Sequence, residues 1–202
     1  SILCLSLVFA CGEQDEPSPL QMAVDYYGLA DGVKRCFSRS DGATEEWVLT
    51  KYTETDSTLQ YQVQAETEGF VVQDRTLTLN VTTDGLFLAS WNDCKSTCLT
   101  PAEPIKILGN PVYARDRFEV EATIEQLSGV LTEEVKETHL FFASEKKPIN
   151  TLTGLKDGYD IQWTRTRDEE VWSHTLVFIG NDGFIGWTDS NGLELTQVEC
   201  SE

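Results

Sequence analysis

The chain has 202 residues, and its 34 acidic and 15 basic side chains give a formal net charge of −19. Proteins bind nucleic acids and anionic lipid headgroups largely through Lys and Arg, so this charge argues against both as direct partners. Hydrophobic residues make up 40% of the chain and aromatic residues 10%, which is enough for a packed core and argues against disorder. The length suits one all-β domain or two small domains, and the composition indicates no particular activity.

The first ten residues form an uncharged apolar run that is too short to span a bilayer as a helix. Residues 1–10 match the apolar part of a secretory signal, and we expect them to be a signal-peptide remnant that is removed. The run ends in Leu7-Val8-Phe9-Ala10-Cys11, which resembles the lipobox of bacterial lipoproteins. The resemblance implies acylation of Cys11 and, because Gly rather than Asp follows, an outer membrane location in the cell envelope. An ordinary cleaved signal is the alternative.

An acidic stretch with two prolines follows Cys11, and this composition is typical of a flexible linker. We therefore predict a lipidated tether over residues 11–24 and a β domain over residues 25–202. Cysteine parity supports this division. Of the six cysteines, Cys4 is lost with the signal and Cys11 carries the lipid, which leaves four thiols that can pair completely.

Apolar and polar residues alternate along much of the predicted domain. Alternation with a period of two predicts antiparallel strands that have one apolar and one solvated face. The clearest such runs cover residues 59–65, 76–81, 118–125 and 159–164. Turn dipeptides suited to tight hairpins lie between the alternating runs, at Asp41-Gly42, Asp84-Gly85, Asp157-Gly158, Asp182-Gly183 and Asn191-Gly192. The fold class predicted is all-β, a single large curved meander sheet or half-open barrel.

Two features interrupt the alternation. Leu127, Leu131 and Val135 have helical spacing, so at most one short helix is expected there. Residues 100–111 contain three of the six prolines, which suits a crossover connection inside one sheet. A split into two small sheets near Gly109 is the alternative.

Three further segments resemble a group of uncharacterised Gram-negative bacterial lipoproteins. They are Tyr26-Tyr-Gly-Leu-Ala-Asp-Gly32 followed by Cys36-Phe37, then Asp84-Gly-Leu-Phe-Leu88, and the late hairpin Gly180-Asn-Asp-Gly-Phe-Ile-Gly186. The resemblance implies a curved or half-open antiparallel sheet similar to periplasmic lipoprotein carriers, and it implies no known activity.

The four remaining cysteines are expected to form disulfides, because export places them in an oxidising compartment. Four cysteines allow three connectivities. Cys94 and Cys98 are close enough in sequence to bridge, which leaves Cys36 on the first strand to pair with Cys200 at the end of the last. We predict no metal site and no cofactor, since neither histidine lies near Cys94 in sequence and finger-like spacing is absent.

Candidates for catalysis are few. The two histidines, His139 and His174, share strand parity with apolar neighbours, so we interpret them as packed at the margin of the core. No hydrolase, phosphate-binding or metalloprotease motif occurs in the sequence. Acidic pairs lie at Glu45-Glu46, Glu133-Glu134 and Asp168-Glu169-Glu170, and we expect them to be solvated residues near hairpin tips.

The five tryptophans are expected in the core, with an exposed sugar-stacking row as the alternative. Two function classes remain. The favoured one is a non-enzymatic domain, anchored to the membrane by its lipid, which binds a protein, glycan or apolar ligand. The alternative is an envelope hydrolase with an unrecognised site formed by a histidine and a carboxylate.

Overall fold

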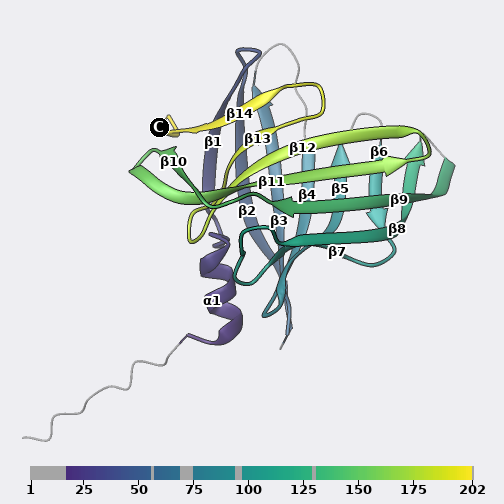
Figure 1. Ribbon diagram of the computed structural model, residues 1–202, viewed down its shortest axis with the longest axis horizontal. Coiled ribbons are helices and arrows are strands. Elements are labelled where there is room, and N and C mark those ends of the chain that lie inside the picture. Colours follow the sequence, from purple (N-terminus) through teal and green to yellow (C-terminus); the bar gives the residue numbers. More distant parts are fainter. Residues whose placement is uncertain (1–16, 56, 69–74, 94–96, 129–130, 202) are drawn as a thin grey trace, which may run out of the picture.

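The computed structural model describes residues 17–55, 57–68, 75–93, 97–128 and 131–201. Within them the chain forms one short helix and fourteen strands of a single antiparallel sheet (Figure 1). The elements are α1 (Pro19–Tyr26), β1 (Lys34–Arg39), β2 (Thr44–Glu54), β3 (Leu59–Glu68), β4 (Arg75–Thr82), β5 (Gly85–Asp93), β6 (Thr97–Pro101), β7 (Ile105–Gly109), β8 (Arg117–Ser128), β9 (Leu131–Ala143), β10 (Lys147–Thr151), β11 (Gly154–Arg167), β12 (Glu170–Ile179), β13 (Gly183–Thr188) and β14 (Glu194–Val198). The predicted all-β class is confirmed.

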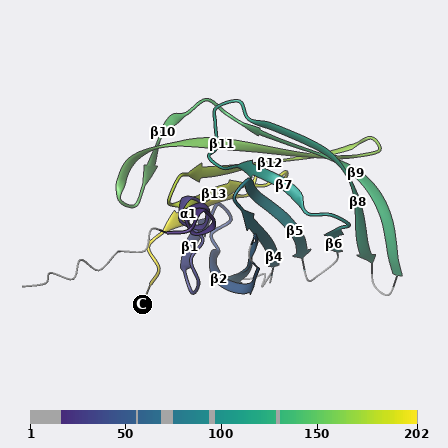
Figure 2. The same cartoon turned by 90° about the horizontal axis from the view of Figure 1, so that it is seen from below.

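The sheet nearly closes into a barrel. Thirteen strands follow one hydrogen-bonded order, β10-β11-β12-β13-β14-β1-β2-β3-β4-β5-β6-β8-β9, and β7 pairs with β5 outside it. Strand β9 also pairs with β11, from Ile161 opposite Ala143 to Thr166 opposite Thr138, so the order returns on itself. Figure 2 shows β8, β9 and β11 arching over the strands from β1 to β6. The single curved sheet is confirmed, and the alternative of two small sheets is wrong.

The alternating residues place one face of each strand inside the barrel, since successive side chains of a strand point to opposite faces. On β3, Leu59, Tyr61 and Val63 are buried, whereas Gln62 between them is exposed. The four predicted runs all lie in strands, within β3, β4, β8 and β11.

Four of the five predicted turn dipeptides connect consecutive strands, and one was assigned wrongly. Asp157-Gly158 lies inside β11, where Gly158 pairs with Lys147. A Cβ atom at Gly158 would lie 2.5 Å from the carbonyl oxygen of Phe178. The glycine therefore permits close packing inside a strand, which its sequence context does not distinguish from a turn.

The short helix expected from the spacing of Leu127, Leu131 and Val135 is wrong, because these residues belong to strands β8 and β9. The helix lies at the start of the domain instead. Helix α1 begins inside the range 11–24 assigned to the tether. Ser18 caps it, because the Ser18 hydroxyl accepts a hydrogen bond from the backbone N–H of Gln21 at 3.1 Å. Ala23 and Val24 on this helix are fully buried, so residues 19–24 are part of the folded domain.

The end of α1 covers one end of the barrel (Figure 1). The Tyr27 hydroxyl donates to the carbonyl oxygen of Gly109 at 2.7 Å, and the Tyr26 hydroxyl accepts from the N–H of Val112 at 3.0 Å. Both rings also contact Phe178, with centroids 5.7 and 6.1 Å away. These contacts fix the helix against the segment that follows β7.

The proline-rich segment expected as a crossover over 100–111 forms parts of two strands. Strand β6 pairs with the second half of β5, and β7 pairs with the first half. Strand β8 pairs with β6 only from Ile124 to Leu127. No strand pairing therefore joins β7 (Ile105–Gly109) to the facing first half of β8 (residues 117–122). We call this boundary the β7–β8 seam.

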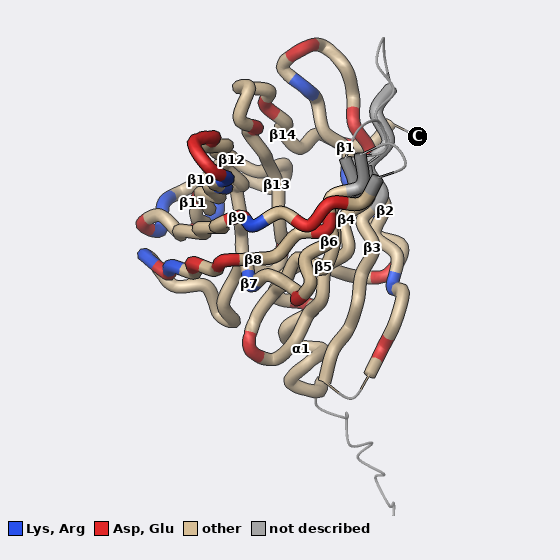
Figure 3. The backbone as a smooth tube through the Cα atoms, turned by 90° about the vertical axis from the view of Figure 1, so that its right-hand side faces the viewer, with Lys and Arg blue, Asp and Glu red and all other residues tan. Residues whose placement is uncertain are grey.

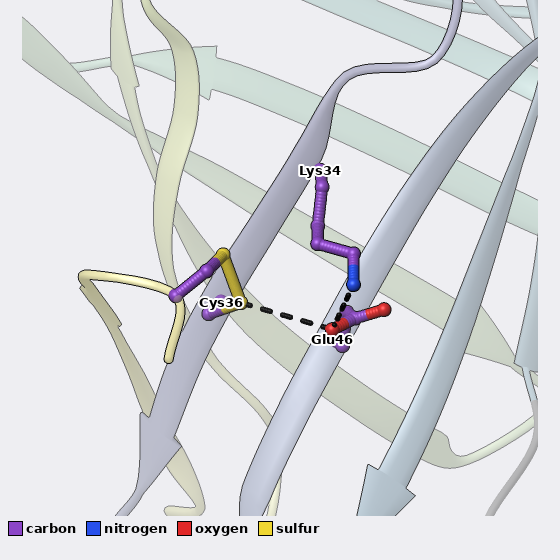
Figure 4. The surroundings of a disulfide bond; sticks show 4 residues. Lys34, Cys36 and Glu46 are labelled. Carbon is purple, nitrogen blue, oxygen red and sulfur yellow. Dashed lines mark hydrogen bonds and ion pairs between the residues drawn. A yellow bond between two sulfur atoms is a disulfide. The ribbon is translucent and has the colours of Figure 1, made fainter. Parts of the chain in front are cut away.

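A disulfide joins Cys36 and Cys200 as expected, with Cα atoms 5.2 Å apart and a sequence separation of 164 (Figure 4). It connects β1 to the residue just beyond β14, and the two strands also pair directly. The chain-entropy model gives a loop of this length roughly 4–5 kcal/mol of stabilisation as an upper value. The predicted Cys94–Cys98 bridge, the signal remnant 1–10 and Cys11 lie outside the described residues and side chains.

Candidate functional site

An apolar cavity of about 50 Å³ occupies the barrel interior. Its lining comes from strands β1 to β5, β7, β9 and β11 to β13, together with Leu29. Among the described residues that line it, Arg35 is the only charged one. A cavity of this size has room for about three to five water molecules, although apolar cavities of similar character stay dry and accept small apolar molecules.

Arg35 is held at the cavity wall by the backbone. Its Nη1 donates to the carbonyl oxygen of Phe184 at 2.7 Å, and its Nη2 donates to that of Gly28 at 2.6 Å. Burial lowers the pKa of Arg35, while the nearby Asp182 carboxylate opposes this. Gly28 and Gly183 both have positive φ, and a Cβ on either would lie within 2.9 Å of the guanidinium. The two glycines thus make room for Arg35, which joins the turn after α1 to the start of β13.

A second set of polar groups lies inside the barrel around Glu137, whose side chain is fully buried. Arg165 donates from Nε and Nη2 to the carboxylate at 2.9–3.0 Å. Arg167 donates from Nε at 2.9 Å and from Nη2, and its Nη1 donates to Gln126 at 2.7 Å. We call Glu137, His139, Arg165 and Arg167 the Glu137 cluster. Burial alone would raise the pKa of Glu137, but His139 and the two arginines outweigh it and lower the pKa to about 2.

His139 lies beside this carboxylate, and among the described residues only its Nδ1 has a hydrogen-bond partner. Trp163 Nε1 donates to His139 Nδ1 at 3.2 Å, and an indole N–H can only donate. The imidazole proton is therefore on Nε2, which lies 3.2 Å from Glu137 Oε2. His139 is only 3% exposed. A general base must be within reach of its substrate, and the enclosed His139 side chain is not, so His139 is a structural residue in this geometry.

His174 is enclosed by aromatic rings. Its ring centroid lies 5.1, 5.8 and 5.7 Å from those of Trp163, Trp91 and Trp187. Within the described part of the chain, neither His174 nitrogen has a hydrogen-bond partner, and neither does Trp187 Nε1. Burial lowers the pKa of His174 to about 4, with a further lowering by the Arg165 charge and an opposing effect of Asp189.

The tryptophans confirm the expected core rather than an exposed row, because Trp47, Trp163 and Trp187 are buried. Trp91 and Trp172 are half-buried, and the Arg165 guanidinium lies 5.8 and 5.3 Å from their rings. These cation–π contacts hold Arg165 in place within the Glu137 cluster.

The expected solvation of the acidic pairs was wrong for Glu45, which is buried and accepts a hydrogen bond from Trp47 Nε1 at 2.6 Å. The Glu137 cluster was missed altogether. A usable signal was present, since Glu137 shares strand parity with His139 and Phe141, and Arg165 and Arg167 share it with Trp163. Charged residues that continue an apolar face predict a buried ion pair.

In the part of the chain that the structure describes, no three His, Cys, Asp or Glu side chains are grouped so that they could hold a metal ion. Among the same residues, no helix has the length and apolarity needed to cross a membrane. No protein-family model matches this chain, and comparison with curated proteins and with solved structures also finds no match. The functional argument therefore depends on the geometry of the interior.

The Glu137 cluster predicts a large effect of one substitution. Glu137→Gln leaves two partly buried guanidinium groups without their shared counter-charge, so we expect the free energy of unfolding to fall by about 3–5 kcal/mol. Urea unfolding at pH 7 measures this loss. Glu133→Gln, the same change at an exposed position of β9, is the control and should stay within about 0.5 kcal/mol of wild type. Equal effects of the two variants would contradict the assigned role.

His174 predicts a pH dependence. Its pKa is about 4 in the folded protein and near 6.5 when unfolded, so the stability tied to neutral His174 is complete above pH 6.5 and is lost as the pH falls towards 4. The loss should reach about 3 kcal/mol. In His174→Phe the unfolding free energy should vary less over this window, as measured by urea unfolding at several pH values. Parallel curves for wild type and variant between pH 6.5 and 5 would exclude this assignment.

Proposed function

We propose that this chain is a lipid-anchored domain of the cell envelope that acts by binding a ligand with a small apolar group in its interior cavity. The apolar lining of that cavity is the observation that carries the proposal. Ligand sites are concave and mostly apolar, with a few polar groups that orient the ligand. Side chains from ten strands line the cavity, so its shape is maintained by the whole sheet.

The geometry favours binding over catalysis. The histidine that lies beside a carboxylate, His139, is buried between Glu137 and Trp163 and is not open to a substrate. The other histidine, His174, is packed among tryptophan rings and has no ion pair with any described carboxylate. A hydrolase would need one of these nitrogens next to a substrate. The buried tryptophans likewise offer no exposed platform for a glycan.

The proposed location is supported by the sequence Leu7-Val8-Phe9-Ala10-Cys11, which resembles a lipobox, and by the acidic, proline-containing residues after it. It also agrees with the placement of α1, because the chain enters the barrel at the end that the helix covers (Figure 1). A lipid on Cys11 would hold that end towards the membrane. The outer membrane remains the expected compartment, since Gly12 follows the cysteine.

Surface charge fits a domain held near a membrane without adsorbing to it. Acidic positions are spread over many strands and loops rather than gathered on one element (Figure 3). The chain carries more than twice as many acidic as basic residues. Such a surface repels anionic headgroups and keeps exposed strand edges from associating.

Filling the cavity should abolish binding. Hexan-1-ol is a suitable neutral probe for a small apolar cavity, and its affinity can be measured by titration calorimetry. Val63 lines the cavity on β3, and Val63→Phe should weaken the affinity at least about tenfold because the added ring takes the ligand's place. Val171→Phe adds the same ring at a position that is 60% exposed and should leave the affinity unchanged. Absence of hexan-1-ol binding to the wild-type chain would refute the proposed function.

The anchor has its own test. Intact-mass spectrometry of the protein extracted from bacterial membranes should show a mature chain that begins at Cys11 and carries acyl chains. A Cys11→Ala variant should lose them and leave the membrane fraction, because a single polypeptide end without lipid has no affinity for the bilayer. A native N-terminus without acyl chains would overturn the proposed anchor while leaving ligand binding intact.

A further inference from the structure

The β7–β8 seam lies beside the cavity. Ile107 and Leu108 of β7 line the cavity from one side of the seam. Phe141 lines it from the other side, on β9, directly opposite Phe118 of β8. Most neighbouring strands of the barrel are joined by backbone hydrogen bonds, which a ligand would have to break. At this seam no strand pairing joins β7 to the first half of β8.

The side chains of Phe118, Lys106 and Asp116 lie at the seam, and Asp116 Oδ2 would lie 3.4 Å from a Cβ at Gly109. Phe118 is half-buried against the core, and its Cζ would lie 3.5 Å from a Cβ at Gly109, at the end of β7. Lys106 of β7 reaches across, with its Nζ 5.0 Å from the centroid of the Phe118 ring and 5.9 Å from that of Phe87. A side-chain barrier of this kind opens by rotamer changes, which are fast and do not require unfolding of strands.

Lys106 combines its place over two aromatic rings with the lack of an ion pair. The chain has 34 acidic residues, and Lys34, Lys51, Lys146, Lys147 and Lys156 all form ion pairs. Within the described part of the chain, Lys106 and the exposed Lys136 form none. Asp116, at the start of β8, accepts a hydrogen bond from the Tyr113 N–H at 2.8 Å instead. The Lys106 ammonium group is therefore held over two aromatic rings with its donors available.

We propose that the β7–β8 seam is the entrance to the cavity and that Lys106 binds the carboxylate of an amphipathic ligand whose apolar tail passes Phe118 into the cavity. This inference rests on the proposed binding function and names its ligand class, a carboxylic acid with a short apolar chain. A neutral apolar ligand would gain nothing from an ammonium group at this position. On a surface of net charge −19, an isolated cation beside an apolar cavity selects an anion locally.

The chain-matched pair hexanoate and hexan-1-ol tests the inference by titration calorimetry. Wild type should bind hexanoate more tightly than hexan-1-ol. Lys106→Met keeps the apolar stem over both rings but removes the charge, so it should weaken hexanoate binding about tenfold and leave hexan-1-ol binding unchanged. Lys106→Arg should retain most of the hexanoate affinity. Lys136→Met, the same loss of charge at an exposed position of β9, should have no effect.

The outcomes separate this inference from the proposed function. If wild type binds hexan-1-ol as tightly as hexanoate, or if Lys106→Met leaves hexanoate affinity unchanged, the head-group assignment is wrong and the apolar site remains. If Lys106→Met weakens both probes equally, Lys106 acts on packing and the assignment is also wrong. If wild type binds neither probe, both proposals fail. Unchanged hexan-1-ol binding by Lys106→Met shows that the variant is folded.

Discussion

The pairing of β9 with β11 is the constraint on which the interior depends. Without it the sheet would be an open curved surface whose apolar face is exposed to water, and with it that face becomes the lining of a closed space. Every residue that alternates inward is then surrounded by residues from distant parts of the sequence. The Cys36–Cys200 disulfide acts in the same sense on the other side of the barrel, where it ties β1 to the chain just after β14.

Closure also explains why charged residues are found inside. A barrel of this width encloses more interior positions than the apolar residues fill, and near the β8–β9 and β11–β12 hairpins some are taken by Glu137, Arg165 and Arg167. A lone buried charge would be prohibitive, but one carboxylate shared by two guanidinium groups is compensated. The planar guanidinium groups of Arg165 and Arg167 bind the buried Glu137 carboxylate and fix the position of β11 relative to β9. The Glu137 cluster thus stabilises the β9–β11 pairing that encloses it.

The interior is thus divided into regions with different properties. The α1 end is closed by the two adjacent tyrosines and by the backbone-bound Arg35. The middle is an apolar cavity, and the charged Glu137 cluster lies beyond Trp163, which contacts both the cavity and His139. Both ends of the interior are filled by specific contacts, and the side at β7 and the first half of β8 has no strand pairing between the two. Strand β7 pairs with β5 while β8 pairs with β6 and β9, so β7 and the first half of β8 meet without backbone pairing, and the proposed lateral entrance lies there.

Local patterns were sufficient for the sheet, the strands and most of its turns, because the alternation in residues such as Leu59, Tyr61 and Val63 and the Asp-Gly turns act over a few residues. The pairing of Cys36 with Cys200 also followed from the sequence, as the pair left once Cys94 and Cys98 were assigned to each other. The sequence could not indicate that Gly158 lies within a strand or that Ala23 and Val24 are buried, since these depend on what packs against them. Strand parity indicates that Glu137, Arg165 and Arg167 face the interior, but only the tertiary structure decides which of them meet. Glu137 lies 28 residues from Arg165, and Lys106 meets Phe118 across a seam that exists only because β7 and β8 fail to pair. Such contacts arise from closure of the barrel, which brings together residues that no local pattern connects.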